Sequence, residues 1–355
     1  MNPSLGHKDL RQVRIAVQGN TIWRQTERLF QRCAETCERL PRQAINQIDR
    51  NRFKTGITRR QQYIPSLFKR LNPVNGLLLA ARQRGYRTEV TPFPEGEFSA
   101  TAPDTRPTAR IRLVRDAQVQ PDPLFAQVFK RHTHKGVYEA RTPDAAALQA
   151  VRDSVKGLPV TLGLVTRNEE AAMARHAQIA MDAWRTELVT PRTLLESYHV
   201  LRIGPKEIAQ HRDGISLNSP MVRALNALGL FDRTQASAPD SSEIKGQLER
   251  FNAAIASTPA YFWLSTARND RITQLETGRA YVRAQLAATA QGLSMHPLSQ
   301  ALQEYPEQAA HYQAVHQLLG AAERGHTVQM WTRLGHGPAI GPAPRRGLEA
   351  HVRKA

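Results

Sequence analysis

Phe129–Tyr138 reads FKRHTHKGVY, and this stretch decides how the rest of the chain is interpreted. Arg131, Thr133 and Lys135 stand at alternate positions, so in an extended segment their side chains project to the same side. Two cations and a short hydroxyl on one side suit a single anionic group such as a phosphate. A solvated basic turn accounts for the same spacing and is the commoner case, so spacing alone leaves both interpretations open.

The far end of the chain carries a second basic element, Gly341–Arg346 (GPAPRR). Pro342 and Pro344 restrict the backbone, so Arg345 and Arg346 are expected to be held in fixed positions. Such a pair can complete an anion site, but it can equally cap a helix or face solvent. By itself this element is a weak signal.

A third element lies in Ala287–Pro306 (AATAQGLSMHPLSQALQEYP), where a long helix is expected to end at Gly292 and turn into a loop. Loops of this kind let backbone N–H groups point at a ligand. No second histidine or carboxylate stands at metal-ligand spacing from His296, so we expect a structural or surface histidine and no metal site. The sequence also lacks a G-x-S-x-G motif, a P-loop and a dinucleotide-binding glycine fingerprint.

The hydrophobic patterns elsewhere predict a mixed fold. Strands are expected at 88–93, 109–114, 160–165, 261–265 and 328–334, with the aromatic-rich 261–265 as a central strand. Helices are expected at 9–39, 76–84, 122–131, 145–155, 169–184, 243–257, 270–291 and 308–324. Strands that alternate with long amphipathic helices indicate an α+β sheet sandwiched by helices.

Composition narrows the class of protein. The chain has 355 residues, 41% of them apolar, which is enough for one large domain or two tightly joined ones. No stretch approaches the roughly 20 apolar residues that span a bilayer, and the first 30 residues do not resemble a secretory signal. Cys33 and Cys37 are more simply two ordinary thiols than a zinc or redox site. We therefore expect a cytoplasmic protein.

The net charge of +18 raises the question of nucleic-acid binding, and its distribution matters. Residues 1–90 hold 18 Lys and Arg against 6 Asp and Glu, whereas the other 265 residues hold 31 against 25. The excess is thus concentrated at one end, where aromatic residues do not interleave with the arginines as a stacking platform requires. Nucleic-acid binding through this end is kept as a minor alternative.

The three elements, in this order, resemble the nitroreductase superfamily. The stretch RHTHKGVY is similar to the family's flavin-phosphate motif Arg-His-Ser-x-Lys-x-Phe, with Thr133 in place of Ser. The resemblance implies that Arg131 and Thr133 contact FMN near its phosphate and Lys135 near its ring. It also implies that backbone after Gly292 lies against the ring and that the terminal arginines close on the phosphate. The implied cofactor-binding residues are Arg131, His132, Thr133, Lys135, Leu293, Ser294, Arg345 and Arg346.

Longer matches, from 77 to 355, resemble the fused, Acg-like branch of the superfamily. This branch implies a nitroreductase-like α+β fold with an antiparallel-rich sheet flanked by long helices, built as two intertwined half-domains (a pseudo-dimer). On this reading 76–121 completes the first half, and 122–355 is the second half with the flavin phosphate site. Residues 1–75 depart from the branch, because Gly19–Trp23 (GNTIW) lacks most of its N-terminal motif. Either half of the flavin pocket is lost, or this segment reflects a shifted reading frame, which sequencing the locus tests.

The resemblance implies an FMN-dependent oxidoreductase. It passes hydride or electrons from NADH or NADPH through bound flavin to a small-molecule acceptor, and no side chain is required as acid or base. The departure of residues 1–75 favours a second interpretation, a degenerate flavin-fold protein that sequesters FMN or is inactive. The sequence names neither the acceptor nor the preferred nicotinamide.

Overall fold

The computed structural model describes residues 10–15, 75–97, 106–341, 343–347 and 350. The chain divides into two compact units, residues 129–346 and residues 1–128 together with 347–355. Nearly all of the atypical segment 1–75, including the GNTIW string and both cysteines, lies outside the described residues. The predicted domain boundaries and the pseudo-dimer stay predictions.

The first unit contains a three-stranded antiparallel sheet in the order β1-β3-β2, with a helix at 75–83 directly before β2 in the chain. Its strands are β1 (Leu10–Ile15), β2 (Tyr86–Pro92) and β3 (Ala109–Arg115). The strand expected at 109–114 is confirmed, with Ala109, Ile111 and Leu113 buried at alternate positions. The helix expected at 9–39 is wrong over Leu10–Ile15, where LRQVRI pairs with ARIRLVR. Its apolar residues at 13 and 15 already have the period of a strand.

The helix expected at 122–131 is only a short 3-10 turn, η2 (Pro123–Gln127). Asp122 does cap the turn, since its Oδ1 accepts from the backbone N–H of Leu124 at 3.1 Å. The helix does not continue because the chain is extended further on, where Thr133 bridges to another strand.

The second unit contains a four-stranded antiparallel sheet in the order β4-β7-β9-β8. Its strands are β4 (Thr161–Thr166), β7 (Ala260–Thr266), β8 (Ser294–Pro297) and β9 (Thr327–Gly335). The aromatic-rich strand β7 is central, as predicted, and all its residues except Trp263 are buried. The expected buried strand at 160–165 is instead the edge strand β4, in which only Val165 is buried.

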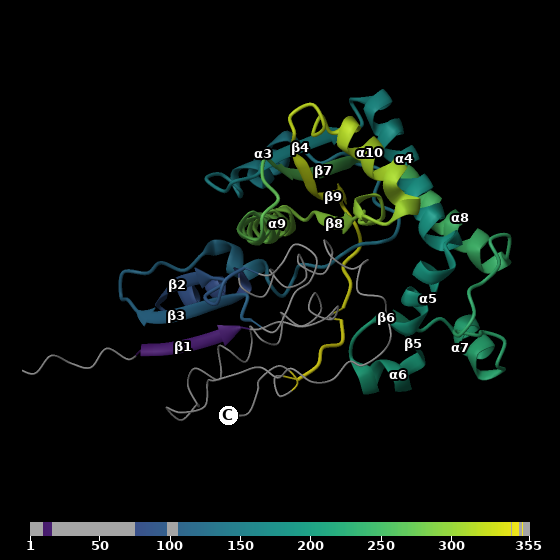
Figure 1. The fold of residues 1–355 in the computed structure, drawn as a ribbon, viewed down its shortest axis with the longest axis horizontal. Helices are drawn as coiled ribbons and strands as arrows, with labels where there is room; N and C mark the ends of the chain where they lie inside the picture. Colours follow the sequence, from purple (N-terminus) through teal and green to yellow (C-terminus); the bar gives the residue numbers. More distant parts are fainter. Residues whose placement is uncertain (1–9, 16–74, 98–105, 342, 348–349, 351–355) are drawn as a thin grey trace, which may run out of the picture. The chain divides into compact units, whose positions relative to one another are not determined.

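Helices cover both faces of this sheet (Figure 1). The long helix α9 contacts β7, β8 and β9, while α4 and α10 lie on the other side with α8 packed against α4. The helices are α3 (Ala145–Asp153), α4 (Glu170–Val189), α8 (Ser242–Ala256), α9 (Arg271–Ala290) and α10 (Ala309–Leu318). Short 3-10 turns lie at η3 (Gln300–Leu302) and η4 (Pro306–Gln308). The predicted antiparallel sheet flanked by long helices is therefore confirmed.

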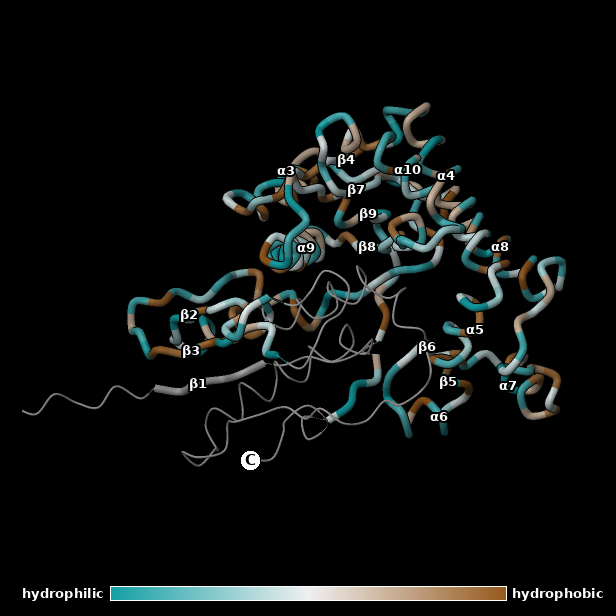
Figure 2. Tube along the Cα trace, viewed as in Figure 1, coloured by the Kyte–Doolittle hydropathy of each residue, from teal (hydrophilic) through white to brown (hydrophobic). Residues whose placement is uncertain are grey.

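A helical excursion between α4 and α8 was not predicted from the sequence. It consists of α5 (Pro191–His199), β5 (Leu201–Ile203), α6 (Gly204–His211), β6 (Ile215–Leu217) and α7 (Pro220–Ala227). Strands β5 and β6 form a two-stranded parallel sheet. Hydrophobic residues follow α7 (Figure 2), yet Leu228 and Leu230 are 72% and 69% exposed, so hydropathy here does not mark core.

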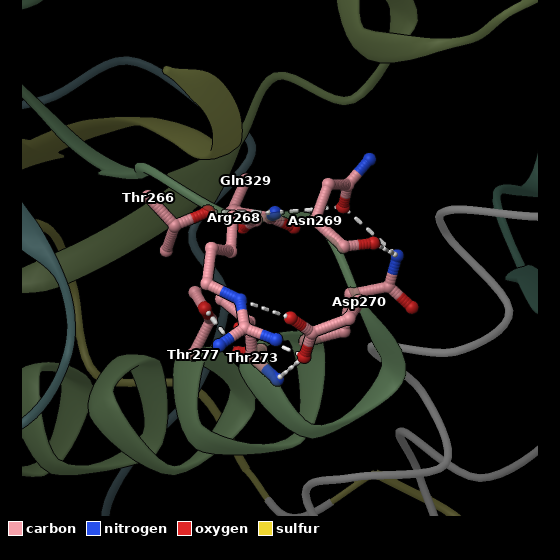
Figure 3. Close-up of polar contacts among 8 residues, drawn as sticks. Thr266, Arg268, Asn269, Asp270, Thr273, Thr277 and Gln329 are labelled. Atoms are coloured by element: carbon pink, nitrogen blue, oxygen red, sulfur yellow. Dashed lines mark hydrogen bonds and ion pairs between the residues drawn. The ribbon is translucent and has the colours of Figure 1, made fainter. Parts of the chain in front are cut away.

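The connection from β7 to α9 is closed by a polar network (Figure 3). The buried Gln329 donates from Nε2 to Thr266 Oγ1 at 3.0 Å and to Asn269 Oδ1 at 2.9 Å. Asp270 caps α9, because its Oδ1 accepts from the backbone N–H of Thr273 at 2.8 Å. These bonds fix where α9 begins and hence where it delivers the chain to β8.

Within the described part of the chain, no helix combines the length and the apolar character needed to cross a bilayer.

Candidate functional site

The predicted anion-binding segment runs beside β8. Thr133 forms a parallel bridge with Met295, and the backbone N–H of His134 donates to the carbonyl of Met295 at 3.3 Å. The backbone is thus locally extended, which was the condition for grouping the side chains of alternate residues. Thr133 is half-buried and His134 is buried. The structure therefore brings the 131–135 segment and the strand after α9 together, although Thr133 and Met295 are 162 residues apart in the sequence.

Side-chain bonds reinforce this pairing at Ser294. His132 donates from Nδ1 to the carbonyl of Lys130 at 3.3 Å, so in the neutral ring Nε2 accepts from the Ser294 hydroxyl at 3.1 Å. The hydroxyl of Tyr138 donates to the backbone carbonyl of Ser294 at 3.0 Å. Ser294 is buried between these partners, and its strand is fixed to the segment at two points.

The turn from α9 into β8 differs from the loop that the sequence predicts. Gly292 has a φ of +69°, a left-handed conformation that ends the helix, and the N–H of Leu293 donates to the Ala288 carbonyl at 2.8 Å. The chain then enters β8 directly, because Ser294–Pro297 pair with β9. Leu293 is buried, and its N–H is already used by the Ala288 carbonyl, so a contact between Leu293 and a cofactor stays a prediction.

The site carries positive charge. Arg131 is half-buried and Lys135 is exposed. Burial raises the pKa of Tyr281, and the nearby charge of Arg131 opposes that rise. Burial also holds the pKa of His296 well below its usual value, and Arg333, Lys135 and His134 lower this pKa further. Tyr281 thus lies near the charge of Arg131, and His296 lies near the charges of Arg333 and Lys135.

Arg333 anchors the segment from the centre of the sheet and was missed by the sequence reasoning. It is fully buried, and its guanidinium donates to five acceptors around it. They are Thr258 Oγ1 (2.8 Å), His296 Nδ1 (3.0 Å), the Gly136 carbonyl (3.1 Å), Ser257 Oγ (3.4 Å) and the Ala254 carbonyl. The guanidinium also lies over the ring of Tyr138, 4.5 Å from its centroid. An arginine inside the apolar run QMWTRLG was the available signal.

A second arginine, Arg167, helps Arg333 to bind the C-terminal end of α8. Its Nη2 donates to the Ser257 carbonyl at 2.7 Å, and its Nε donates to the Thr258 carbonyl at 3.3 Å. Cations are favourable at a helix C-terminus, where backbone carbonyls lack intrahelical donors. The end of α8, the 131–138 segment and β8 thus form one hydrogen-bonded assembly.

The C-terminal arginines lie with other partners. Arg345 is buried, and its Nη1 donates to the Pro344 carbonyl at 2.9 Å. Arg346 is 3.2 Å from the carboxylate of Asp213, which also pairs with Arg202 at 3.0 Å. The contact of Arg346 therefore lies with the connection between α6 and β6, while Arg131, Thr133 and Lys135 lie along β8. A role for Arg345 and Arg346 in cofactor binding stays a prediction.

Across the described residues, no three His, Cys, Asp or Glu side chains are grouped as metal ligands. The donors along β8 are a guanidinium, an ammonium, hydroxyls and imidazoles, and this donor set suits an anionic ligand.

No protein-family model and no curated protein matches the chain. Solved structures do match. An FMN-dependent nitroreductase from Mycobacterium smegmatis, solved in complex with NADPH, is 17% identical over 64% of this chain and 96% of that one, with a TM-score of 0.40. A nitroreductase with bound FMN from Desulfitobacterium hafniense is 12% identical over 64% and 96%, with a TM-score of 0.36. A nitroreductase-like family protein from Bacillus cereus is 13% identical over 66% and 96%, with a TM-score of 0.35.

These three structures are a nitroreductase with NADPH, a nitroreductase with FMN and a nitroreductase-like protein, and the sequence motifs resemble the same superfamily.

Proposed function

We propose that this chain binds FMN along the 131–135 segment and β8, and that it works as an FMN-dependent oxidoreductase. The observation that carries the proposal is the bridge between Thr133 and Met295, supported by the bond between His132 and Ser294. Through these contacts two cations, a threonine hydroxyl and the strand after α9 come to lie around one stretch of backbone.

The residues of the site fit a flavin mononucleotide. A phosphate needs cationic hydrogen bonds for its charge and a short hydroxyl for its orientation, and Arg131 and Thr133 offer both. The positive charges of Arg131 and Lys135, which act on the neighbouring Tyr281 and His296, favour an anion at this place. We further propose that Leu293 and Ser294 border the cofactor where the chain enters β8. His132 contributes through its hydrogen bond to Ser294. Arg345 and Arg346 are its outer members, with smaller effects on binding.

When bound, FMN supplies hydride and electron transfer from NADH or NADPH to a small acceptor. The chain's own residues bind and orient. Arg131 and Lys135 supply charge, the Tyr138 hydroxyl and His132 hold Ser294 in place, and Arg333 ties the segment to the sheet. No side chain is assigned as a general acid or base.

The test is FMN binding by Arg131→Ala against a matched control, Arg175→Ala. Arg175 is an exposed arginine of α4, so its removal changes the net charge equally without touching the site. Loss of a charge-assisted bond to phosphate, worth about 1.5–3 kcal/mol, is expected to raise the Kd for FMN roughly 10- to 100-fold. Fluorescence quenching of added FMN measures this. Wild-type protein that takes up no FMN contradicts the proposal.

Turnover separates the two flavin-based interpretations. FMN-loaded protein that NADH or NADPH reduces, and that passes electrons to a quinone or nitroaromatic, is the expected oxidoreductase. FMN binding with neither donor oxidised would favour the sequestering protein instead. The nucleic-acid alternative concerns residues 1–70, nearly all outside the described ranges. DNA binding that is lost in high salt and on removal of these residues would support it.

A further inference from the structure

His296 is a buried histidine whose hydrogen bonding can be assigned. It lies in β8 directly opposite Arg333 of β9, and only 8% of its surface is exposed. The guanidinium of Arg333 donates to its Nδ1 at 3.0 Å. A guanidinium has no acceptor, so Nδ1 must be unprotonated and the single proton of the neutral ring must be on Nε2.

The Nε2–H of His296 is a donor that still needs an acceptor. Within the described ranges, no group forms a hydrogen bond with it. Nε2 is not one of the fully buried polar atoms that lack a partner, so this N–H is accessible and can donate to a ligand that offers an acceptor. The ring remains neutral because burial and the charge of Arg333 both oppose a second proton.

The surroundings of His296 restrict what that ligand can be. Lys135 and His134 lie close enough to lower its pKa, and Phe251 meets the ring edge-on with centroids 6.3 Å apart. A protonated Nε2 beside an ammonium cannot ligate a metal cation. An electron-rich carbonyl oxygen or ring nitrogen, on a planar group beside the phenyl ring, is the complementary partner.

The position of His296 links it to the cofactor site. Its neighbour Met295 is bridged to Thr133, and Ser294, two residues earlier on the same face of β8, is bonded to His132. Alternate residues of a strand are roughly 7 Å apart, so the ring of His296 continues the row begun by Ser294.

We propose that His296 contacts the flavin, its Nε2–H donating to the N1–C2=O edge of the isoalloxazine. This edge gains negative charge when the flavin is reduced, so the donor stabilises the reduced form. The inference rests on the proposed function, since it requires FMN at this site. It assigns to His296 two separate bonds, one to Arg333 for the fold and one to the cofactor.

The test uses two substitutions that divide these bonds. In His296→Asn the amide oxygen takes the place of Nδ1 and still accepts from Arg333, but the outer donor is lost. In His296→Gln the amide N–H reaches the place of Nε2, but the acceptor for Arg333 is lost. FMN affinity, the absorbance spectrum and midpoint potential of bound flavin, and the melting temperature of the apoprotein are measured for both.

His296→Asn is expected to bind FMN roughly 3- to 10-fold more weakly, with a more negative flavin potential and a nearly unchanged melting temperature. His296→Gln is expected to keep the affinity and the potential and to melt earlier. If His296→Asn matches wild type in FMN affinity, spectrum and potential while Arg131→Ala loses FMN, His296 forms a hydrogen bond with Arg333 only and does not contact the flavin. The inference about His296 is then wrong, and the proposed function stands. If wild type binds no FMN, both fall.

A change on the cofactor tests the same bond in the unmodified protein. 2-Thio-FMN carries a weaker acceptor at the proposed edge, so wild type is expected to bind it several-fold more weakly than FMN. His296→Asn should discriminate less between the two flavins. Equal affinity of wild type for both would overturn the proposal even if neither variant folds.

Discussion

Two buried histidines, His176 of helix α4 and His296 of strand β8, have the same hydrogen-bonding pattern but different surroundings. The comparison shows why we assign a structural role to the first and a ligand contact to the second. His176 of α4 accepts at Nδ1 from the indole N–H of Trp331 at 2.9 Å, and His296 of β8 accepts at Nδ1 from Arg333 at 3.0 Å. Neither donor can accept, so both rings are neutral with the proton on Nε2. Burial lowers the pKa of both.

Their surroundings differ. The ring of His176 stacks on Tyr261, with centroids 4.5 Å apart, and lies 5.7 Å from the rings of both Trp263 and Trp331. It is enclosed by aromatic groups that give a ligand no charge to recognise. His296 instead lies on an edge strand beside cations. The same tautomer thus lies in an aromatic core over the central strands β7 and β9 in one case, and on the edge strand β8 beside the proposed cofactor in the other.

The largest expected effect on stability comes from replacing Arg333, the donor to His296. Arg333→Met keeps much of the side-chain volume but leaves several buried acceptors without a donor, among them Thr258 Oγ1, the Gly136 carbonyl and His296 Nδ1. We expect the free energy of unfolding to fall by roughly 3–5 kcal/mol. Denaturant unfolding at neutral pH measures it.

Arg279→Met is the matched control for this substitution. Arg279 is a half-exposed arginine of α9, 3.5 Å from Glu276, and its replacement should cost under about 0.5 kcal/mol. If both substitutions lower the free energy of unfolding equally, the guanidinium of Arg333 does not stabilise the fold. The bond from Arg333 to Nδ1 of His296 would then have no structural role.

The sequence could predict the parts of the fold that depend on long local patterns. The central strand and α9 were found because an apolar run and a 20-residue helical pattern bounded by Asp270 and Gly292 are visible locally. The excursion of short elements between α4 and α8 was missed, because three-residue strands such as β5 leave no periodic signal. The sequence predicts a buried strand at β4 because its Leu and Val residues are apolar. Its place at the edge of the sheet depends on pairing with the distant β7, which the local sequence does not encode.

The same limit applies to the site. The alternation of Arg131, Thr133 and Lys135 is local, so the sequence can predict their grouping, and the bridge at Thr133 gives the extended backbone that this prediction needs. Arg333 binds the Gly136 carbonyl across 197 residues of sequence, and no local pattern encodes such a contact. His296 was expected to be structural or at the surface. It is buried and structural at Nδ1, whereas the role of Nε2 depends on the bridge between the 131–135 segment and β8.

The next largest effect on stability is expected from Gly163→Ala in β4, next to the aromatic rings around His176. A Cβ at Gly163 would lie 2.0 Å from the ring of Trp263, so the indole that borders His176 has to move. Overpacking of this kind costs roughly 1–3 kcal/mol. Thermal unfolding and tryptophan emission measure the effect. FMN affinity should stay at the wild-type value, since the site along β8 is untouched.

Gly246→Ala in α8 serves as the control. Its Cβ would meet only the end of the flexible Arg250 side chain at 3.4 Å, and alanine favours the helix by roughly 0.5–1 kcal/mol. We expect Gly163→Ala to lower the stability of the protein and Gly246→Ala to raise it. If Gly163→Ala leaves the stability unchanged, the aromatic rings around His176 are loosely packed.

The smallest effect is the dependence of stability on pH at His176. Burial lowers its pKa to about 3 in the folded protein, against about 6.5 in an unfolded chain. Below pH 6.5 the unfolded state therefore binds a proton that the folded state refuses. The stability from this group is complete above pH 6.5 and is lost as the pH falls toward 3. At pH 5.5 the loss is about 1.4 kcal/mol, and it depends only on the unfolded value, since the folded pKa lies well below 5.5.

His176→Asn isolates this contribution. The amide oxygen can still accept from Trp331, but the side chain no longer titrates, so the variant should be less stable at neutral pH and lose about 1.4 kcal/mol less than wild type between pH 7.5 and pH 5.5. His296→Asn should flatten the same profile, because burial and the charge of Arg333 depress that pKa too. The two substitutions should act independently, because the two rings accept from different donors, Trp331 and Arg333. An unchanged profile in His176→Asn would show that this histidine is not the group that carries the loss.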